Sequence, residues 1–302
     1  MARSAVPTPH PTRSLTRMRL LSNLLPATSL VVLALALGGP SRGAAPADAK
    51  PVRALLVIGG CCHDYKKQQE LLTKGISARA NVQWAVAYDP DTTTKHMNPV
   101  YEKDDWAKGF DVVVHDECSA DVKDPKIVER ILKPHKEGLP GVVLHCAMHS
   151  YRTEGFPKST PWFDFTGLAT TGHGPQMPID VRYIDRESPI TKGLGDWKTI
   201  NEELYNNVTG KLLATAQPLA KGKQALKSRD GKERVDEAVV TWTNTYNGKT
   251  KVFATTLGHN NDTVADAKYL DLVARGLLWS VGKLDDAHLK PAAKVLLSDS
   301  DK

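Results

Sequence analysis

The chain has little net charge outside its first residues, and it lacks a glycine-rich dinucleotide loop. Its formal charge is +6 over 302 residues, but residues 1–49 hold five arginines against one aspartate, which leaves the remainder at +2. So balanced a composition lacks the basic footprint of nucleic-acid-binding proteins. No Gly-x-Gly-x-x-Gly sequence follows the first apolar strand. We therefore expect no nucleic-acid partner and no tightly held dinucleotide.

Long apolar runs are also scarce, and the longest lies near the amino terminus at residues 30–37. Arginines precede this run and small residues follow it at 43–49, a pattern typical of a secretory signal peptide. Pro26 interrupts the wider apolar stretch, which disfavours a membrane span of about 20 residues. We expect residues 1–49 to be a signal peptide with a short linker, and the protein to be exported to the periplasm or cell exterior. An uncleaved signal that anchors the chain in the membrane is the alternative.

Only four cysteines are present, Cys61, Cys62, Cys118 and Cys146. All four fall at or just after the ends of expected strands. An exported chain permits disulfides, but the sequence does not assign their pairing. A bridge from the loop after the first strand to the third or fourth strand and a set of buried free thiols both stay open.

The first half of the folded region alternates between short apolar runs and amphipathic segments. Strands are expected at residues 53–59, 82–88, 111–115 and 141–145, and helices at 66–79 and 124–136. Continuous apolar runs are typical of parallel strands that helices cover on both faces. This rhythm predicts a doubly wound, mostly parallel α/β sheet.

The second half is less regular. Residues 150–207 are rich in proline, glycine and aromatic side chains, and we expect them to form an elaborated loop over the carboxyl ends of the strands. Further strands are expected at residues 212–217, 238–246 and 251–257, and a closing helix at 264–281. The predicted organisation is one α/β domain over residues 50–284, followed by a loose tail over 285–302.

Four apolar runs each lead into a histidine: His63, His115, His145 and His259. In open α/β sheets, ligands bind in the crevice outside the carboxyl ends of the strands. Imidazole titrates near neutral pH and ligates metals. The sequence therefore predicts a polar, chemically competent pocket at this edge of the sheet.

Five motifs occur in a fixed order along the chain. They are Gly59-Gly60-Cys61-Cys62-His63-Asp64, Gly141 to Ala147, Ser188 to Leu194, Glu202-Glu203-Leu204-Tyr205 and Thr256-Leu257-Gly258-His259. Together they resemble the ThuA-like (trehalose-utilisation-like) domain over about residues 53–283. The resemblance implies a flavodoxin-like fold similar to class I glutamine amidotransferases. It also implies a role in the metabolism of trehalose, related glycosides and 3-keto sugars.

We assign candidate catalytic roles to His63, His115, His149, Glu203 and His259. Histidines suit proton transfer beside a carbonyl, because a base with a pKa near the working pH is most efficient. The four histidines of this set could instead hold a divalent metal such as zinc. Both interpretations stay open.

Six further residues are candidates for substrate binding: Asp64, Asp116, His145, Arg152, His173 and Tyr205. Simpler roles compete for some of them, since Asp64 could cap a helix and Arg152 could lie over an aromatic ring. Three aromatic side chains are candidates to stack on sugar rings: Trp162, Phe163 and Trp197. The remaining histidines of the folded region, His96, His135 and His288, are expected at the surface.

These assignments predict a carbohydrate-active hydrolase, lyase or isomerase. A non-catalytic sugar-binding partner of other exported enzymes is the first alternative. A Cys–His hydrolase that uses Cys146 with His259 as base is the second. It is disfavoured because Cys146 lacks flanking glycines, and because Asn260 stands where the amidotransferase pattern continues with Pro-Glu.

Overall fold

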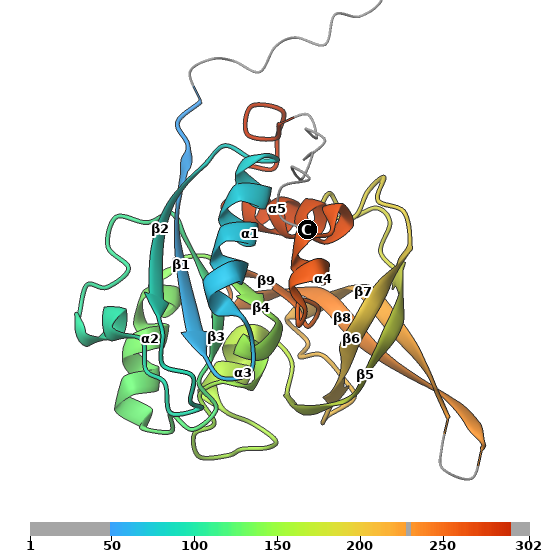
Figure 1. Ribbon diagram of the computed structural model, residues 1–302. Coiled ribbons are helices and arrows are strands. Elements are labelled where there is room, and N and C mark those ends of the chain that lie inside the picture. Colours follow the sequence, from blue (N-terminus) through green and yellow to red (C-terminus); the bar gives the residue numbers. More distant parts are fainter. Residues whose placement is uncertain (1–48, 228–230, 291–302) are drawn as a thin grey trace, which may run out of the picture. The chain divides into compact units, whose positions relative to one another are not determined.

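The computed structural model describes residues 49–227 and 231–290. One nine-stranded sheet forms its centre, in the order β2-β1-β3-β4-β9-β8-β7-β5-β6 (Figure 1). The expected signal peptide lies outside the described residues, except for Ala49 at the end of its linker. No helix among the described residues combines the length and the hydropathy that crossing a bilayer requires.

The predicted parallel strands are confirmed, with their bounds shifted by at most three residues. Its parallel strands are β1 (Val52–Gly60), β2 (Val82–Asp89), β3 (Val112–Cys118), β4 (Gly141–Leu144) and β9 (Thr250–Thr255). All seven residues of β3 are buried, as a strand covered on both faces requires. The carboxyl ends of β1, β3, β4 and β9 therefore meet at one edge.

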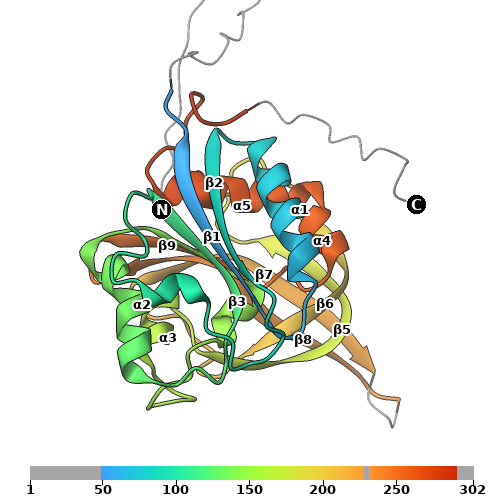
Figure 2. The same cartoon turned by 60° about the vertical axis from the view of Figure 1, so that its left-hand side comes forward.

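Helices cover the two faces of these strands (Figure 2). They are α1 (Tyr65–Ser77), α2 (Pro125–Glu137), α3 (Pro161–Thr166), α4 (Asn261–Ala265) and α5 (Ala267–Ser280), with 3₁₀ turns η1 (Pro99–Glu102) and η2 (His145–His149). Leu56 and Ile58 of β1 pack in the apolar cluster that includes α1 and α5. Leu55 and Val57 pack in a second cluster that includes α2 and α3. Alternate residues of one strand thus enter two separate cores.

Local signals explain the helix bounds. Asp124 accepts the Lys126 N–H and Pro125 occupies the first turn of α2, as a helix start favours. Gly138 ends α2 with a φ of 119°. The closing helix expected over 264–281 is divided into α4 and α5, because Asp266 is extended and caps α5 through the Lys268 N–H.

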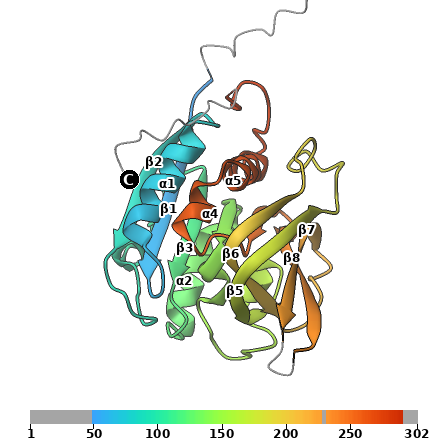
Figure 3. The same ribbon diagram turned by 45° about the vertical axis from the view of Figure 1, so that its right-hand side comes forward.

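The expected loop over residues 150–207 was wrong. This region contains α3 and the long antiparallel strands β5 (Thr170–Tyr183) and β6 (Trp197–Asn207), which continue the sheet through β7 (Ala216–Lys227) and β8 (Glu233–Tyr246) (Figure 3). Three register shifts interrupt the β5–β6 pairing. Such irregularities break the alternation of apolar and polar residues that reveals a strand in sequence.

The first part of the expected loose tail is also ordered against the domain. Asn81 donates its N–H to the His288 carbonyl, and Lys290 donates its N–H to the Arg79 carbonyl. Residues 291–302 lie outside the described part of the chain.

Candidate functional site

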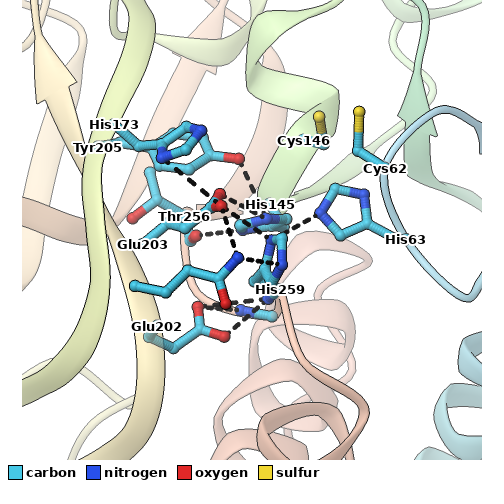
Figure 4. Close-up of polar contacts among 12 residues, drawn as sticks. Cys62, His63, His145, Cys146, His173, Glu202, Glu203, Tyr205, Thr256 and His259 are labelled. Carbon is cyan, nitrogen blue, oxygen red and sulfur yellow. Dashed lines mark hydrogen bonds and ion pairs between the residues drawn. The ribbon is translucent and has the colours of Figure 1, made fainter.

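Three histidines meet at the carboxyl edge of the sheet (Figure 4). His63 lies between β1 and α1, His145 follows β4 directly, and His259 follows β9. One ring nitrogen from each lies within 4.8 Å of the others. His63 Nε2 is 3.0 Å from His259 Nδ1, and the ring centroids of His63 and His145 are 4.7 Å apart.

Glu203 of β6 contributes a buried carboxylate that contacts two of these three rings. Glu203 Oε1 lies 3.2 Å from His259 Nδ1, and its Oε2 lies 3.6 Å from His145 Nε2. The same carboxylate is 3.5 Å from His173 Nδ1. We call His63, His145, His259 and Glu203 the histidine centre.

Backbone carbonyls orient two of the rings. His145 Nδ1 lies 2.7 Å from the Thr256 carbonyl oxygen, and His63 Nδ1 lies 3.2 Å from that of Cys61 and 3.0 Å from the Tyr65 hydroxyl. A nitrogen that donates to a carbonyl carries the proton, which leaves the opposite Nε2 with its lone pair. In both rings that Nε2 faces the histidine centre.

The turn after β4 is conformationally strained. His145 has a φ of 40°, in the left-handed region that non-glycine residues seldom occupy. Strain of this kind clusters at functional sites, where the surrounding structure imposes it. The strained position therefore holds a histidine, with Cys146 one residue beyond it.

The electrostatics separate the rings into two kinds. Burial lowers the pKa of His63 to about 4 and holds that of His145 well below its usual value. Burial also opposes charge on His259, but the hydrogen bond and negative charge of Glu203 outweigh it and raise the His259 pKa. For Glu203, burial is outweighed by His259, so its pKa is lowered. The centre thus combines a His259–Glu203 pair, in which the carboxylate favours the protonated ring, with imidazoles whose burial favours the neutral form.

Two residues that support His259, Glu202 and Gln176, had no role predicted from the sequence. Buried Glu202 accepts the backbone N–H groups of Gly258 at 3.2 Å and His259 at 2.8 Å, which fixes the turn after β9. Burial raises the pKa of Glu202 to about 7, against the opposing effect of hydrogen bonds from the backbone N–H groups of Asn260 and Gly258. Gln176 of β5 contacts His259 Nε2 with its side-chain amide at 2.8 Å. The pairing of β5 with β6 aligns Gln176 with Glu203.

A cavity of about 280 Å³ opens beside the centre. Pockets for drug-sized ligands span about 300–1,000 Å³, so this one suits a small molecule. Its lining includes four further predicted site residues: His149, Arg152, His173 and Tyr205. Tyr205 places its hydroxyl 3.2 Å from His145 Nε2, and its ring stacks on His149 at 4.2 Å. Burial lowers the pKa of His149 to about 3.

Arg152 lies over an aromatic ring, the simpler of the two roles weighed for it, and it also lines the cavity, so substrate binding stays a prediction. Its guanidinium lies 4.9 Å from the centre of the Phe156 ring. Its Nε donates to the His149 carbonyl at 2.9 Å. Asp64, in contrast, caps α1 by accepting the Lys67 N–H and is absent from the cavity lining.

The structure separates His115 and Asp116 from the cavity. His115 pairs in register with Val57, and both belong to the face of the sheet that α2 and α3 cover. Its Nδ1 lies 2.9 Å from Glu117 Oε1, and its Nε2 lies 3.0 Å from His135 Nε2. Asp116 is buried, and its pKa is raised by burial and by the charge of Glu117. The hydroxyls of Tyr101 and Tyr151 donate to Glu117. We call these two tyrosines, together with His115, His135 and Glu117, the buried histidine cluster.

Two other expectations about exposure were wrong. The histidines expected at the surface are all buried: His96, His135 and His288. The aromatic side chains expected to stack on sugar are buried as well: Trp162, Phe163 and Trp197. Trp162, for example, donates its indole N–H to the Ala147 carbonyl at 2.7 Å and thereby packs the core.

The four cysteines form two disulfides, Cys61–Cys62 and Cys118–Cys146. All four line the cavity. Neither bridge joins the loop after β1 to β3 or β4; the second instead joins β3 to η2. A sulfur in a disulfide cannot act as a thiolate nucleophile, so this oxidised form does not support the Cys–His hydrolase interpretation.

Among the described residues, two groups of side chains bring three potential metal ligands together, but the sulfurs of the second group are held in disulfides and cannot act as thiolate ligands in this form. The first is His63, His145 and His259, and the second is Cys61, Cys62 and Cys118. The predicted metal ligands His115 and His149 belong to neither group. Neutral imidazoles whose far nitrogens are fixed by carbonyls fit the ligands of zinc, so the first group suits that ion.

Comparisons with known proteins agree with this fold. A family model named ThuA and described as trehalose utilisation matches residues 53–280. A ThuA-like protein from Parabacteroides merdae is similar in structure, with a TM-score of 0.58, 18% identity, and coverage of 77% of this chain and 90% of its own. Another from Bacteroides uniformis has a TM-score of 0.52, 15% identity, and coverage of 80% and 96%. The glutaminase domain of Trypanosoma brucei CTPS gives a TM-score of 0.41 at 14% identity, covering 79% of this chain and 100% of that domain. No protein with a curated description matches the sequence.

Proposed function

Because the chain belongs to the ThuA, or trehalose-utilisation, family, we propose that it is an enzyme acting on a glycoside or keto-sugar at the histidine centre. One observation carries the proposal: a His259–Glu203 pair lies against neutral imidazoles beside a small cavity. A charged acid and a neutral base within one site are what proton-transfer catalysis requires.

The proposed chemistry is proton transfer beside a carbonyl. In a sugar oxidised at carbon 3, the hydrogen on carbon 2 is acidic. A neutral imidazole of the centre, His63 or His145, takes that proton, and the resulting electron pair expels the substituent on carbon 1. His259, held protonated by Glu203, gives its proton to the departing oxygen. His63 and His259 line the cavity, and His145 lies beside His63. Because the proton and the departing group leave from neighbouring carbons, the reaction is a lyase-type elimination.

A divalent metal fits the same centre as an alternative to proton transfer, because a ring that ligates a metal is neutral and cannot also act as acid or base. His63, His145 and His259 would hold it, and two of these rings already have their far nitrogens on backbone carbonyls. Such an ion acts as a Lewis acid that polarises a sugar carbonyl. Elemental analysis of the purified protein tests this part of the proposal. A zinc content near one per chain that His63→Ala removes would support it, and a metal-free active enzyme would contradict it.

The test of function is conversion of trehalose, simple glycosides and their 3-keto derivatives, followed by chromatography. We expect Glu203→Gln to lower turnover by about 10²–10⁴-fold, the range for loss of acid–base assistance. His288→Asn, at a histidine that bonds to Asp285 outside the cavity lining, is the matched control and should keep full turnover. Unchanged turnover in Glu203→Gln would overturn the proposal. Sugar binding without conversion of any compound would support the sugar-binding partner instead.

We further propose that the protein is exported through its first 49 residues. The basic, apolar and small-residue segments support this proposal. Cell fractionation of a carboxyl-terminally tagged chain should place a shortened protein outside the cytoplasm. Full-length protein in the membrane fraction would indicate an uncleaved signal that anchors the chain. Full-length protein in the cytoplasm would contradict export.

A further inference from the structure

Four sulfur atoms from three separate stretches of the chain meet in the cavity. Cys61 and Cys62 follow β1, Cys118 ends β3, and Cys146 lies in η2. They form a disulfide between neighbours and a second disulfide across the sheet edge. The acid–base chemistry proposed above makes no use of either.

The two disulfides are in contact. Cys61 Sγ lies 3.4 Å from Cys118 Sγ. Disulfides exchange when a thiolate attacks one sulfur of another disulfide and the second sulfur leaves. If Cys61 were released from Cys62, its sulfur would already lie beside the Cys118 sulfur it must attack.

The first disulfide is more exposed than the second. Cys62 is exposed and Cys61 is partly buried. Cys118 and Cys146 are only 3% and 8% exposed. A reductant in solution therefore reaches the Cys61–Cys62 disulfide first, because access governs thiol–disulfide exchange.

We propose that the four cysteines form a relay that passes two electrons from a dithiol reductant in solution to Cys146. One thiolate of the dithiol attacks Cys62 and releases Cys61 as a thiolate; the second thiol then frees Cys62 and closes the reductant's own disulfide. Cys61 attacks Cys118, a Cys61–Cys118 bond forms, and Cys146 leaves as a thiolate. The products are one oxidised dithiol, one protein disulfide and two protein thiols, Cys62 and Cys146.

The relay ends within the histidine centre's cavity. Cys146 lines that cavity together with His149, His63 and His259. The relay would place a new thiol there only under reducing conditions. The inference stands apart from the proposed sugar chemistry, because its test reads sulfur connectivity and needs no sugar.

A pair of single substitutions separates the relay from two independent disulfides. In Cys62→Ser, Cys61 has lost its partner and should attack Cys118 without any added reductant. Alkylation followed by peptide mapping should then find the free thiol on Cys146 and a Cys61–Cys118 bond. In the control Cys61→Ser, label should fall on Cys62, with Cys146 labelled several-fold less. A free thiol that stays on Cys61 in Cys62→Ser, beside an intact Cys118–Cys146 bond, would overturn the relay.

The unmodified protein provides a second test if either variant fails to fold. One molar equivalent of a dithiol should yield label on Cys62 and Cys146. Label on Cys61 and Cys62 with Cys118–Cys146 intact would overturn the proposal, because reduction would then have stopped at the first disulfide.

Discussion

Two groups of histidines lie at the same sheet, and they differ in access and not in residue type. In the histidine centre, rings from three loops line or adjoin a cavity and share one carboxylate. In the buried histidine cluster, His115 contacts Glu117 and His135, and His135 Nδ1 contacts the Leu139 carbonyl at 2.7 Å. None of His115, His135 and Glu117 lines that cavity. The comparison teaches that histidine chemistry requires a face left open to a ligand.

The largest effect should come from breaking the buried cluster. Glu117 is fully buried and accepts hydrogen bonds from Tyr101 and Tyr151 at 2.7 and 2.8 Å. Glu117→Leu leaves these buried hydroxyls and His115 without their acceptor, so we expect the free energy of unfolding to fall by about 3–5 kcal/mol. Denaturant titration measures it, and exposed Glu70→Leu is the control. A loss no larger than that of the control would mean that the cluster does not hold the core.

Glu202→Gln tests how the centre is supported. The amide would turn one N–H group toward the backbone donors of Gly258 and His259, which leaves at least one buried donor without an acceptor. We expect the free energy of unfolding to fall by up to about 3 kcal/mol, and turnover to fall with it because His259 shifts. Glu237→Gln, on the surface beside two lysines, should change both quantities little. Equal behaviour of the two variants would contradict this role.

The buried cluster should also leave a mark on the pH dependence of stability. Burial, followed by the charge of His115, lowers the pKa of His135 from 6.5 to about 3. The unfolded chain therefore binds one more proton at this site between those two values. The contribution of neutral His135 to the free energy of unfolding is fully present above pH 6.5 and is lost as the pH falls toward 3. At pH 5 the loss is about 2 kcal/mol.

The variant His135→Leu isolates this contribution. Its unfolding free energy should fall less steeply between pH 6.5 and pH 4, by about one proton's worth of slope. Urea titrations at a series of pH values give the slope. Identical slopes in the two proteins would show that His135 does not resist protonation in the fold.

The smallest effect should come from the rim of the histidine centre. The His173 side chain is 43% exposed and lies 3.5 Å from Glu203 Oε1. His173→Asn should lower turnover by less than tenfold and change the free energy of unfolding by no more than about 0.5 kcal/mol. Steady-state kinetics check the first value. A loss as large as that expected for Glu203→Gln would place His173 within the reacting groups.

The parallel strands could be predicted from sequence, because a strand that is buried on both faces has apolar residues at consecutive positions. The β3 segment Val112-Val113-Val114 is such a run, and the bounds of its strand were predicted to within three residues. β5 could not be, because it is half exposed and its bulges shift the register near Gly172 and Pro178. The contact of Gln176 with His259 could not be predicted either, because it depends on the β5–β6 pairing that aligns Gln176 with Glu203.

The site was predicted in part for a related reason. A histidine at the end of a strand predicts the correct edge of the sheet, as it does for His63 and His259. It does not say which face the ring enters, because neighbouring positions of a strand point to opposite sides. The His115 ring points to the face that α2 and α3 cover, which the position of His115 at the strand end did not reveal. His145 was assigned to substrate binding, because nothing in its sequence reveals the left-handed turn that directs it to the centre.

Turnover and stability measured together in His145→Asn and His115→Asn test the comparison most directly. Asparagine tolerates the left-handed backbone at 145, so that variant should fold and yet convert the best keto-glycoside at least about 100-fold more slowly. His115→Asn should lose stability but keep its turnover per folded molecule. Full turnover in His145→Asn, or its loss in folded His115→Asn, would contradict the account.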